Sequence, residues 1–212
     1  MIGWVVRNVI TREQSVMLNI FKSLIRPHIE YCVQIWSPTA RHGNWGIIME
    51  IEDVQRRFTR MVDGIGLLPY KERLSKLSIT TLLERRMRGD LIETFKIFKG
   101  LVDYGSTVLK FSRSGYNIVT TGRGTRKSDF FSNRVAKYWN KLPAFVKDAI
   151  SVDSFKARLG SYKTTNATTT GNFWELSEEI FTRIDESHRS NFTDFMLDNP
   201  NVAKRRNINC KL

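Results

Sequence analysis

The residues of this 212-residue sequence best suited to chemistry are cations that recur on one side of predicted helices. In the segment that follows Thr81, four cations fall within about 80° of a helix surface, at 100° per residue. They are Arg85, Arg88, Lys96 and Lys99. Cations on a rigid helix suit the phosphate backbone of nucleic acid, because each neutralised phosphate releases counterions. Such contacts position a duplex without reading its sequence.

Two further groups of cations extend this pattern. Arg56, Arg57 and Arg60 gather near the end of a predicted helix over 45–62, where they also complement the negative end of the helix dipole. The last group contains Arg126, Lys127, Arg134 and Lys137. Aromatic residues alternate with these cations, and we expect them to pack in the core and not to stack on bases. For each group the alternative is a solvated helix face. The predicted nucleic-acid-binding residues are these three groups.

The charge of the chain supports this interpretation and divides the sequence. The chain holds 34 Lys and Arg, 21 Asp and Glu, and a net charge of +13. Residues 1–163 contain 28 cations and 14 carboxylates, and residues 164–212 contain 6 and 7. All of the excess charge therefore belongs to residues 1–163, for which we predict a nucleic-acid partner. The polar run over 164–171 indicates a linker. For residues 172–212 we predict a separate helical tail.

Other kinds of site lack the residues they need. The two cysteines, Cys32 and Cys210, exclude a disulfide framework or a four-thiolate zinc site. The pair His28 and Cys32 supplies only two of about four zinc ligands, and no Ser-His-Asp set is indicated. We therefore predict no catalytic residue, no metal ligand and no cofactor. No stretch reaches the roughly 18–20 apolar residues of a membrane helix, so we predict no membrane partner.

The elements that would carry these residues are predicted from apolar spacing. Thr11 with Gln14, and Thr81 with Glu84, match capping boxes that begin helices. Pro27 is expected to push the residue before it out of the helical region, although Pro27 can itself open a second helical turn. The interval 28–36 is ambiguous between helix and strand. Helices are predicted over 11–25, 45–62, 69–77, 81–98, 131–142, 151–162 and, in the tail, 173–197. The interval 113–127 could hold a short strand or a small β-hairpin. The expected fold is mainly α, a helical bundle.

Several motifs occur in order along residues 1–163. They are the run from Phe21 to Cys32, Trp36-Ser-Pro38, Val54-Gln-Arg-Arg57, Tyr70-Lys-Glu-Arg-Leu74, the run from Leu83 to Ile92, and Trp139-Asn-Lys-Leu-Pro143. Together they resemble the segment just downstream of the polymerase palm in reverse transcriptases of non-LTR retrotransposons, the jockey-like LINE group. The resemblance covers three quarters of the chain. Residues 164–212 match nothing in that family.

The resemblance implies a thumb-like helical region that helps to grip an RNA/DNA template–primer duplex. In that family, polymerase chemistry depends on an aromatic-Ala-Asp-Asp turn whose carboxylates hold Mg²⁺. This sequence has no Asp-Asp pair. The palm and fingers would be partners outside it, and Mg²⁺ would belong to the palm. The resemblance thus implies a polymerase fragment, in the nucleus or cytoplasm. The alternatives are a non-catalytic helical scaffold, or a decayed reading frame without selected activity.

We predict that this chain cannot extend a primer, because it lacks the paired carboxylates that hold the two metal ions. The measurement is incorporation of deoxynucleotides on a primed RNA template, with Mg²⁺ present or chelated. Incorporation that depends on the metal would contradict the prediction.

Overall fold

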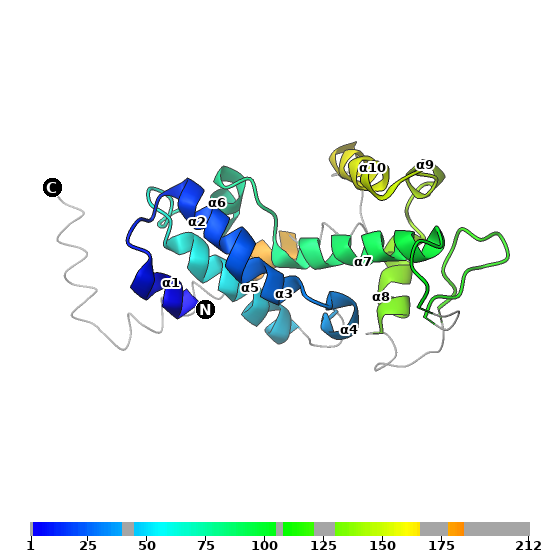
Figure 1. Cartoon of the computed structure of the whole chain (residues 1–212), viewed down its shortest axis with the longest axis horizontal. Helices are drawn as coiled ribbons and strands as arrows, with labels where there is room; N and C mark the ends of the chain where they lie inside the picture. Colours follow the sequence, from blue (N-terminus) through cyan, green and yellow to red (C-terminus); the bar gives the residue numbers. More distant parts are fainter. Residues whose placement is uncertain (1, 40–44, 105–107, 121–129, 166–177, 185–212) are drawn as a thin grey trace. The chain divides into compact units, whose positions relative to one another are not determined.

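The computed structural model describes residues 2–39, 45–104, 108–120, 130–165 and 178–184. By its contacts the chain divides into two compact units, Met1–Ser177 and Glu178–Leu212. In the second unit, residues 178–184 form a helix. In the first, helices account for most of the described residues, which confirms the mainly α prediction (Figure 1).

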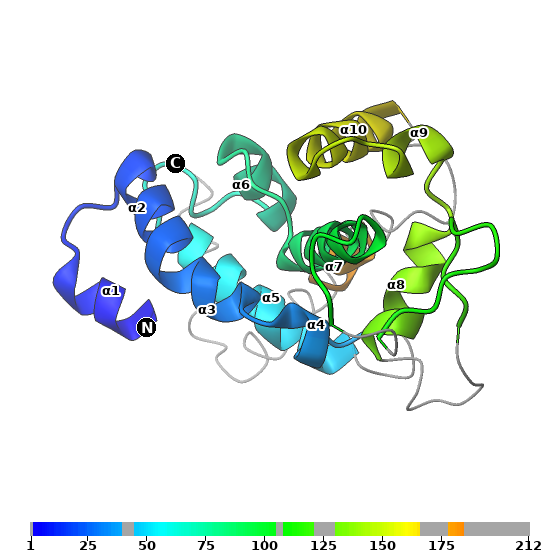
Figure 2. The same ribbon diagram turned by 45° about the vertical axis from the view of Figure 1, so that its right-hand side comes forward.

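The first part of the larger unit is a long helical run that packs against α5. The run contains α1 (Ile2–Asn8), α2 (Gln14–Ile20), η1 (Phe21–Ile25), α3 (Arg26–Glu30) and α4 (Val33–Trp36). Helix α5 (Trp45–Arg60) returns alongside it in both views (Figures 1 and 2). The rings of Phe21 and Phe58 lie 5.0 Å apart between them. Met17, Ile25 and Leu82 complete the core there, so apolar burial holds this pair together.

The stretch around Pro27 differs from the prediction. Arg26 keeps helical backbone angles and is not displaced, because the helix takes one wider π-helical turn over Phe21–Ile25. The Arg26 N–H reaches back to the Phe21 carbonyl, and Pro27, which has no N–H, begins the next turn without losing a bond. The left-handed backbone of Cys32 then separates α3 from α4.

The second part of the larger unit is built around α7 (Leu82–Phe98). Its neighbours are α5, α8 (Phe131–Trp139) and α10 (Val152–Thr165), while α6 (Tyr70–Lys76) packs on α5 and α9 (Ala144–Lys147) on α10. Figure 2 views α7 nearly end-on, with α10 and α8 beside it. The stacked rings of Phe95 and Phe155, 4.4 Å apart, join α7 to α10.

Of the two threonines predicted to cap helices, one does so. Thr81 caps α7 as expected, since its Oγ1 accepts a hydrogen bond from the Glu84 N–H at 3.2 Å. Thr11 does not cap a helix: it accepts from the Glu13 N–H, and α2 begins at Gln14. No strand occurs among the described residues. Within those residues a single antiparallel bridge joins Phe111 to Ile118, close to the start of the hairpin expected over 113–127. Residues 121–127 of that interval lie outside the described residues.

The linker and tail fall mostly beyond what the structure describes. Helix α10 runs to Thr165, two residues into the segment predicted as a linker. Residues 166–171 of that linker lie outside the described ranges. Of the tail helix predicted over 173–197, only 178–184 is described, and it is helical.

Candidate nucleic-acid interface

Arg134 is the clearest departure from the predicted set. Its side chain is 6% exposed and pairs with Asp90 of α7 at 2.8 Å. The same guanidinium donates to the carbonyls of Val33 and Ser37, at 3.1 and 2.9 Å. These partners join α8 to α7 and to the end of α4. Since the guanidinium is buried and already bound by carboxylate and carbonyl oxygens, we withdraw Arg134 from the phosphate-binding set and assign it a structural role.

The cations of α5 are divided between pairing and exposure. Asp53 pairs with Arg56 at 2.7 Å and with Arg57 at 3.6 Å. The Arg57 side chain is nevertheless 71% exposed, against 12% for Arg56. Arg60 is exposed. Exposed pairs of this kind are worth little and exchange readily for other anions. Arg57 and Arg60 therefore remain candidates for phosphate contact, and Arg56 is mainly committed to its own helix.

The cations of α7 do not share one environment either. Arg85 pairs with Glu30 of α3, and Lys96 with Glu93 at 3.0 Å. Arg88 makes a long hydrogen bond of 3.3 Å to the Lys156 carbonyl. Lys99 is exposed, with its ammonium 5.4 Å from the Phe98 ring. Of the four predicted positions, Arg88 and Lys99 are thus the least committed to carboxylates.

The remaining predicted positions lie on or before α8. Lys137 is exposed on that helix, with its ammonium 5.6 Å from the Tyr138 ring. Arg126 and Lys127 lie outside the described residues. Their contact with nucleic acid stays a prediction.

A feature that the sequence did not predict is a basic groove. It is a hollow of about 380 Å³ that draws on three separated stretches of the chain: the η1–α3 junction, the start of α7 and the end of α10. Ser78 and Thr80, from the connection before α7, also line it. Its cations are Lys22, Arg26, Arg85, Arg88 and Lys163, and the one carboxylate that the described residues contribute to its lining is that of Glu84.

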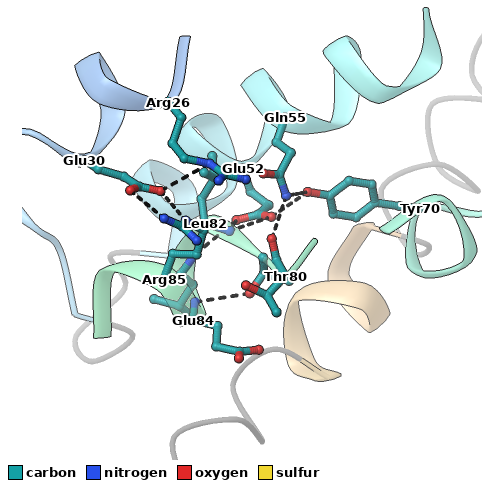
Figure 3. Close-up of polar contacts among 11 residues, drawn as sticks. Arg26, Glu30, Glu52, Gln55, Tyr70, Thr80, Leu82, Glu84 and Arg85 are labelled. Carbon is teal, nitrogen blue, oxygen red and sulfur yellow. Dashed lines mark hydrogen bonds and ion pairs between the residues drawn. The ribbon is translucent and has the colours of Figure 1, made fainter. Parts of the chain in front are cut away.

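Two ion pairs join the elements that form the basic groove. Glu84 of α7 binds Lys163 of α10, and Glu30 of α3 binds Arg85 of α7. Glu30 is shared, because the Arg26 Nε lies 3.7 Å from its Oε1 (Figure 3). Burial lowers the pKa of Arg26, and repulsion from Arg85 lowers it further. The five cations of the groove therefore carry more positive charge than the carboxylates of Glu30 and Glu84 neutralise.

Behind the groove, a buried carboxylate fixes the start of α7. Glu52 of α5 accepts hydrogen bonds from the Tyr70 hydroxyl at 2.6 Å and from the Leu82 N–H at 2.9 Å (Figure 3). The Leu83 N–H also donates to it, at 3.3 Å. Burial raises the pKa of Glu52, partly offset by these hydrogen bonds. A remote side chain thus satisfies two N–H groups that a helix start leaves open.

The charge that balances Glu52 comes from Arg86. This side chain is 1% exposed, and its three guanidinium nitrogens make no hydrogen bond within the described part of the chain. Burial lowers the pKa of Arg86 to about 10, while Glu52 and then Asp90 raise it. Its guanidinium lies 5.9 Å from the Trp36 ring, a cation–π distance. The Arg86 side chain therefore belongs to the interior of the larger unit.

Comparison of the chain with family models, curated proteins and solved structures found no match. Within the described residues, no helix is both long and apolar enough to cross a membrane. The same residues contain no grouping of three or more His, Cys, Asp or Glu side chains arranged around a metal position.

Proposed function

We propose that this chain binds nucleic acid through its phosphate backbone, as a polymerase fragment that retains a duplex-binding region and lacks the catalytic palm. The observation that carries the proposal is the convergence of five cations from three stretches of chain on the basic groove, whose rim a duplex backbone can contact. Two of them, Arg85 and Arg88, belong to the set predicted from the sequence. The resemblance to non-LTR reverse transcriptases names an RNA/DNA hybrid as the duplex.

The exposed cations outside the groove add to this surface. They include Arg57 and Arg60 on α5, Lys99 directly after α7, and Lys137 on α8, which are all exposed. Against the proposal stand the ion pairs of Arg56, Arg85 and Lys96, which reduce the charge offered to a phosphate. Binding should therefore be electrostatic, insensitive to sequence and moderate in strength.

We expect the affinity for an RNA/DNA hybrid with hydroxyl ends to fall steeply with salt. Three or more phosphate contacts give a slope of log affinity against log salt of about −3 or steeper. Fluorescence anisotropy of a labelled hybrid, titrated at several salt concentrations, measures this slope. Changing Arg57 and Lys99, two exposed cations outside the groove, together to Ala should make the slope shallower by about 2 and weaken binding to all sequences alike.

The matched control changes the same amount of charge elsewhere. Lys71 and Lys76 are exposed on α6 and lie outside the predicted set. The Lys71→Ala/Lys76→Ala variant should keep the slope of the unchanged chain. A flat slope for that chain, or equal losses in both double variants, would favour the alternative of a helical scaffold without a nucleic-acid surface.

A further inference from the structure

The size of the basic groove bears on which part of a nucleic acid it could take. A volume of about 380 Å³ lies in the range of small-molecule sites. A double helix cannot enter such a hollow, whereas a single terminal nucleotide can. The backbone of a duplex could contact only its rim. The interior cations therefore need a ligand smaller than a duplex.

The charge of the groove favours a doubly charged ligand. Five cations and one carboxylate line it, a formal charge of +4, which becomes +3 when Glu30, the partner of Arg26 and Arg85, is counted with them. A phosphomonoester carries about −1.5 to −2 charges at pH 7 and three acceptor oxygens, whereas each phosphodiester of a backbone carries one charge. Because attraction grows with the charge of the ligand, a monoester gains more from this site than a diester.

The groove also holds donors that make no hydrogen bond to a carboxylate. The Arg26 Nε is buried, and although it lies 3.7 Å from Glu30 Oε1 it makes no hydrogen bond among the described residues. Within the same residues Arg88 has only its long contact to the Lys156 carbonyl, and Lys22 is exposed. Arginine guanidinium groups bind phosphate oxygens through charge-assisted, often bidentate hydrogen bonds.

We propose that the basic groove binds a phosphomonoester, the terminal phosphate of a nucleic-acid strand, with Lys22, Arg26 and Arg88 around its oxygens. This inference deepens the proposed function: the duplex lies on the exposed cations, and the groove holds one phosphorylated strand end. The same phosphate chemistry occurs in a free nucleoside monophosphate, which the test must distinguish.

The test compares hybrids that differ only at their ends. Labelled hybrids carry a 5′-phosphate, a 3′-phosphate or hydroxyls alone, and anisotropy gives each affinity for the full chain. We expect one phosphorylated end to bind about tenfold more tightly than the hydroxyl end, the gain of one hydrogen-bonded charge contact. Adenosine monophosphate, added as a competitor, should remove that preference while leaving the hydroxyl-ended hybrid bound.

Variants place the preference in the groove. Lys22→Ala/Arg88→Ala should reduce the tenfold preference to nearly none. The control Lys110→Ala/Arg113→Ala, which changes two exposed cations of the 110–119 turn, should retain it. Thermal unfolding reports whether each variant folds. Should the double variant not fold, Lys22→Glu reverses the charge of one exposed side chain and should also reduce the preference.

The outcomes separate the two proposals. Equal affinity for phosphorylated and hydroxyl ends would overturn the groove inference and leave the salt-dependent duplex binding standing. A preference that survives Lys22→Ala/Arg88→Ala would place the end-binding site elsewhere and also overturn it. Binding of adenosine monophosphate without binding of any hybrid would support the phosphomonoester site and overturn the proposed function.

Discussion

Replacing Arg134 with Met is expected to lower the free energy of unfolding by about 3–5 kcal/mol, the typical cost of removing one partner from a buried ion pair. The change leaves Asp90, itself buried, without its guanidinium partner. It also removes the donor that the carbonyls of Val33 and Ser37 share, and with it the link between α8 and α4. Urea denaturation followed by circular dichroism measures the loss.

A control and a second variant sharpen the Arg134 prediction. Lys137→Met removes an exposed cation from the same helix and should change stability by less than about 0.5 kcal/mol. Adding Asp90→Leu to Arg134→Met should recover part of the loss, because an apolar pair avoids the unpaired buried charge. If Arg134→Met costs no more than Lys137→Met, the structural role assigned to Arg134 is wrong.

Arg134 also shows where charge patterns mislead. It stands in a segment rich in cations and aromatics, and that composition favoured a nucleic-acid surface. The opposing signal was Asp90, a charge set among the apolar positions Met87 and Leu91 of α7. A buried carboxylate needs a buried cation. No local spacing indicates, however, that the partner of Asp90 lies 44 residues further along the chain.

The helices themselves were largely predictable, because apolar spacing and capping residues act locally. Thr81 marked the start of α7 correctly, and the apolar stripe of α7 is buried at Leu83, Met87 and Leu91. The wide turn at Phe21–Ile25 was not predictable in the same way. Pro27 alone favours a break. The continuous helix depends on the packing of Phe21 and Ile25 against α5, which is tertiary.

The buried face of α5 is wider than apolar spacing alone indicates. Phe58 is buried and Ile51 packs against the core, but Ile47 is 52% exposed. Glu52 and Gln55, which are polar, are fully buried. Polar residues at helical spacing usually mark a solvated face. Here Gln55 and Glu52 instead meet Tyr70 and the start of α7. The groove was missed likewise, since Lys22, Arg88 and Lys163 converge only through the packing of three helices.

Replacing Glu52 with Ala is expected to lower the free energy of unfolding by about 3–5 kcal/mol at neutral pH. The change leaves the Tyr70 hydroxyl and the Leu82 and Leu83 N–H groups buried without their acceptor, and Arg86 loses a balancing charge. Glu50→Ala, an exposed change on the same helix, is the control and should cost less than about 0.5 kcal/mol. Equal losses in the two variants would show that Glu52 does not secure α7.

The loss caused by Glu52→Ala should depend on pH in a defined direction. Because burial raises the pKa of Glu52, the folded chain binds this proton more tightly than the unfolded chain does. The contribution of Glu52 to stability is therefore greatest below its unfolded pKa of about 4.3 and decreases as pH rises through its folded pKa. Asp90, whose pKa burial also raises, is present in both chains and cancels in the comparison. Urea denaturation of both chains between pH 4 and 8 should show the difference narrowing with pH. A difference that widens instead would mean that hydrogen bonds and Arg86 outweigh burial, and that Glu52 is held as a carboxylate.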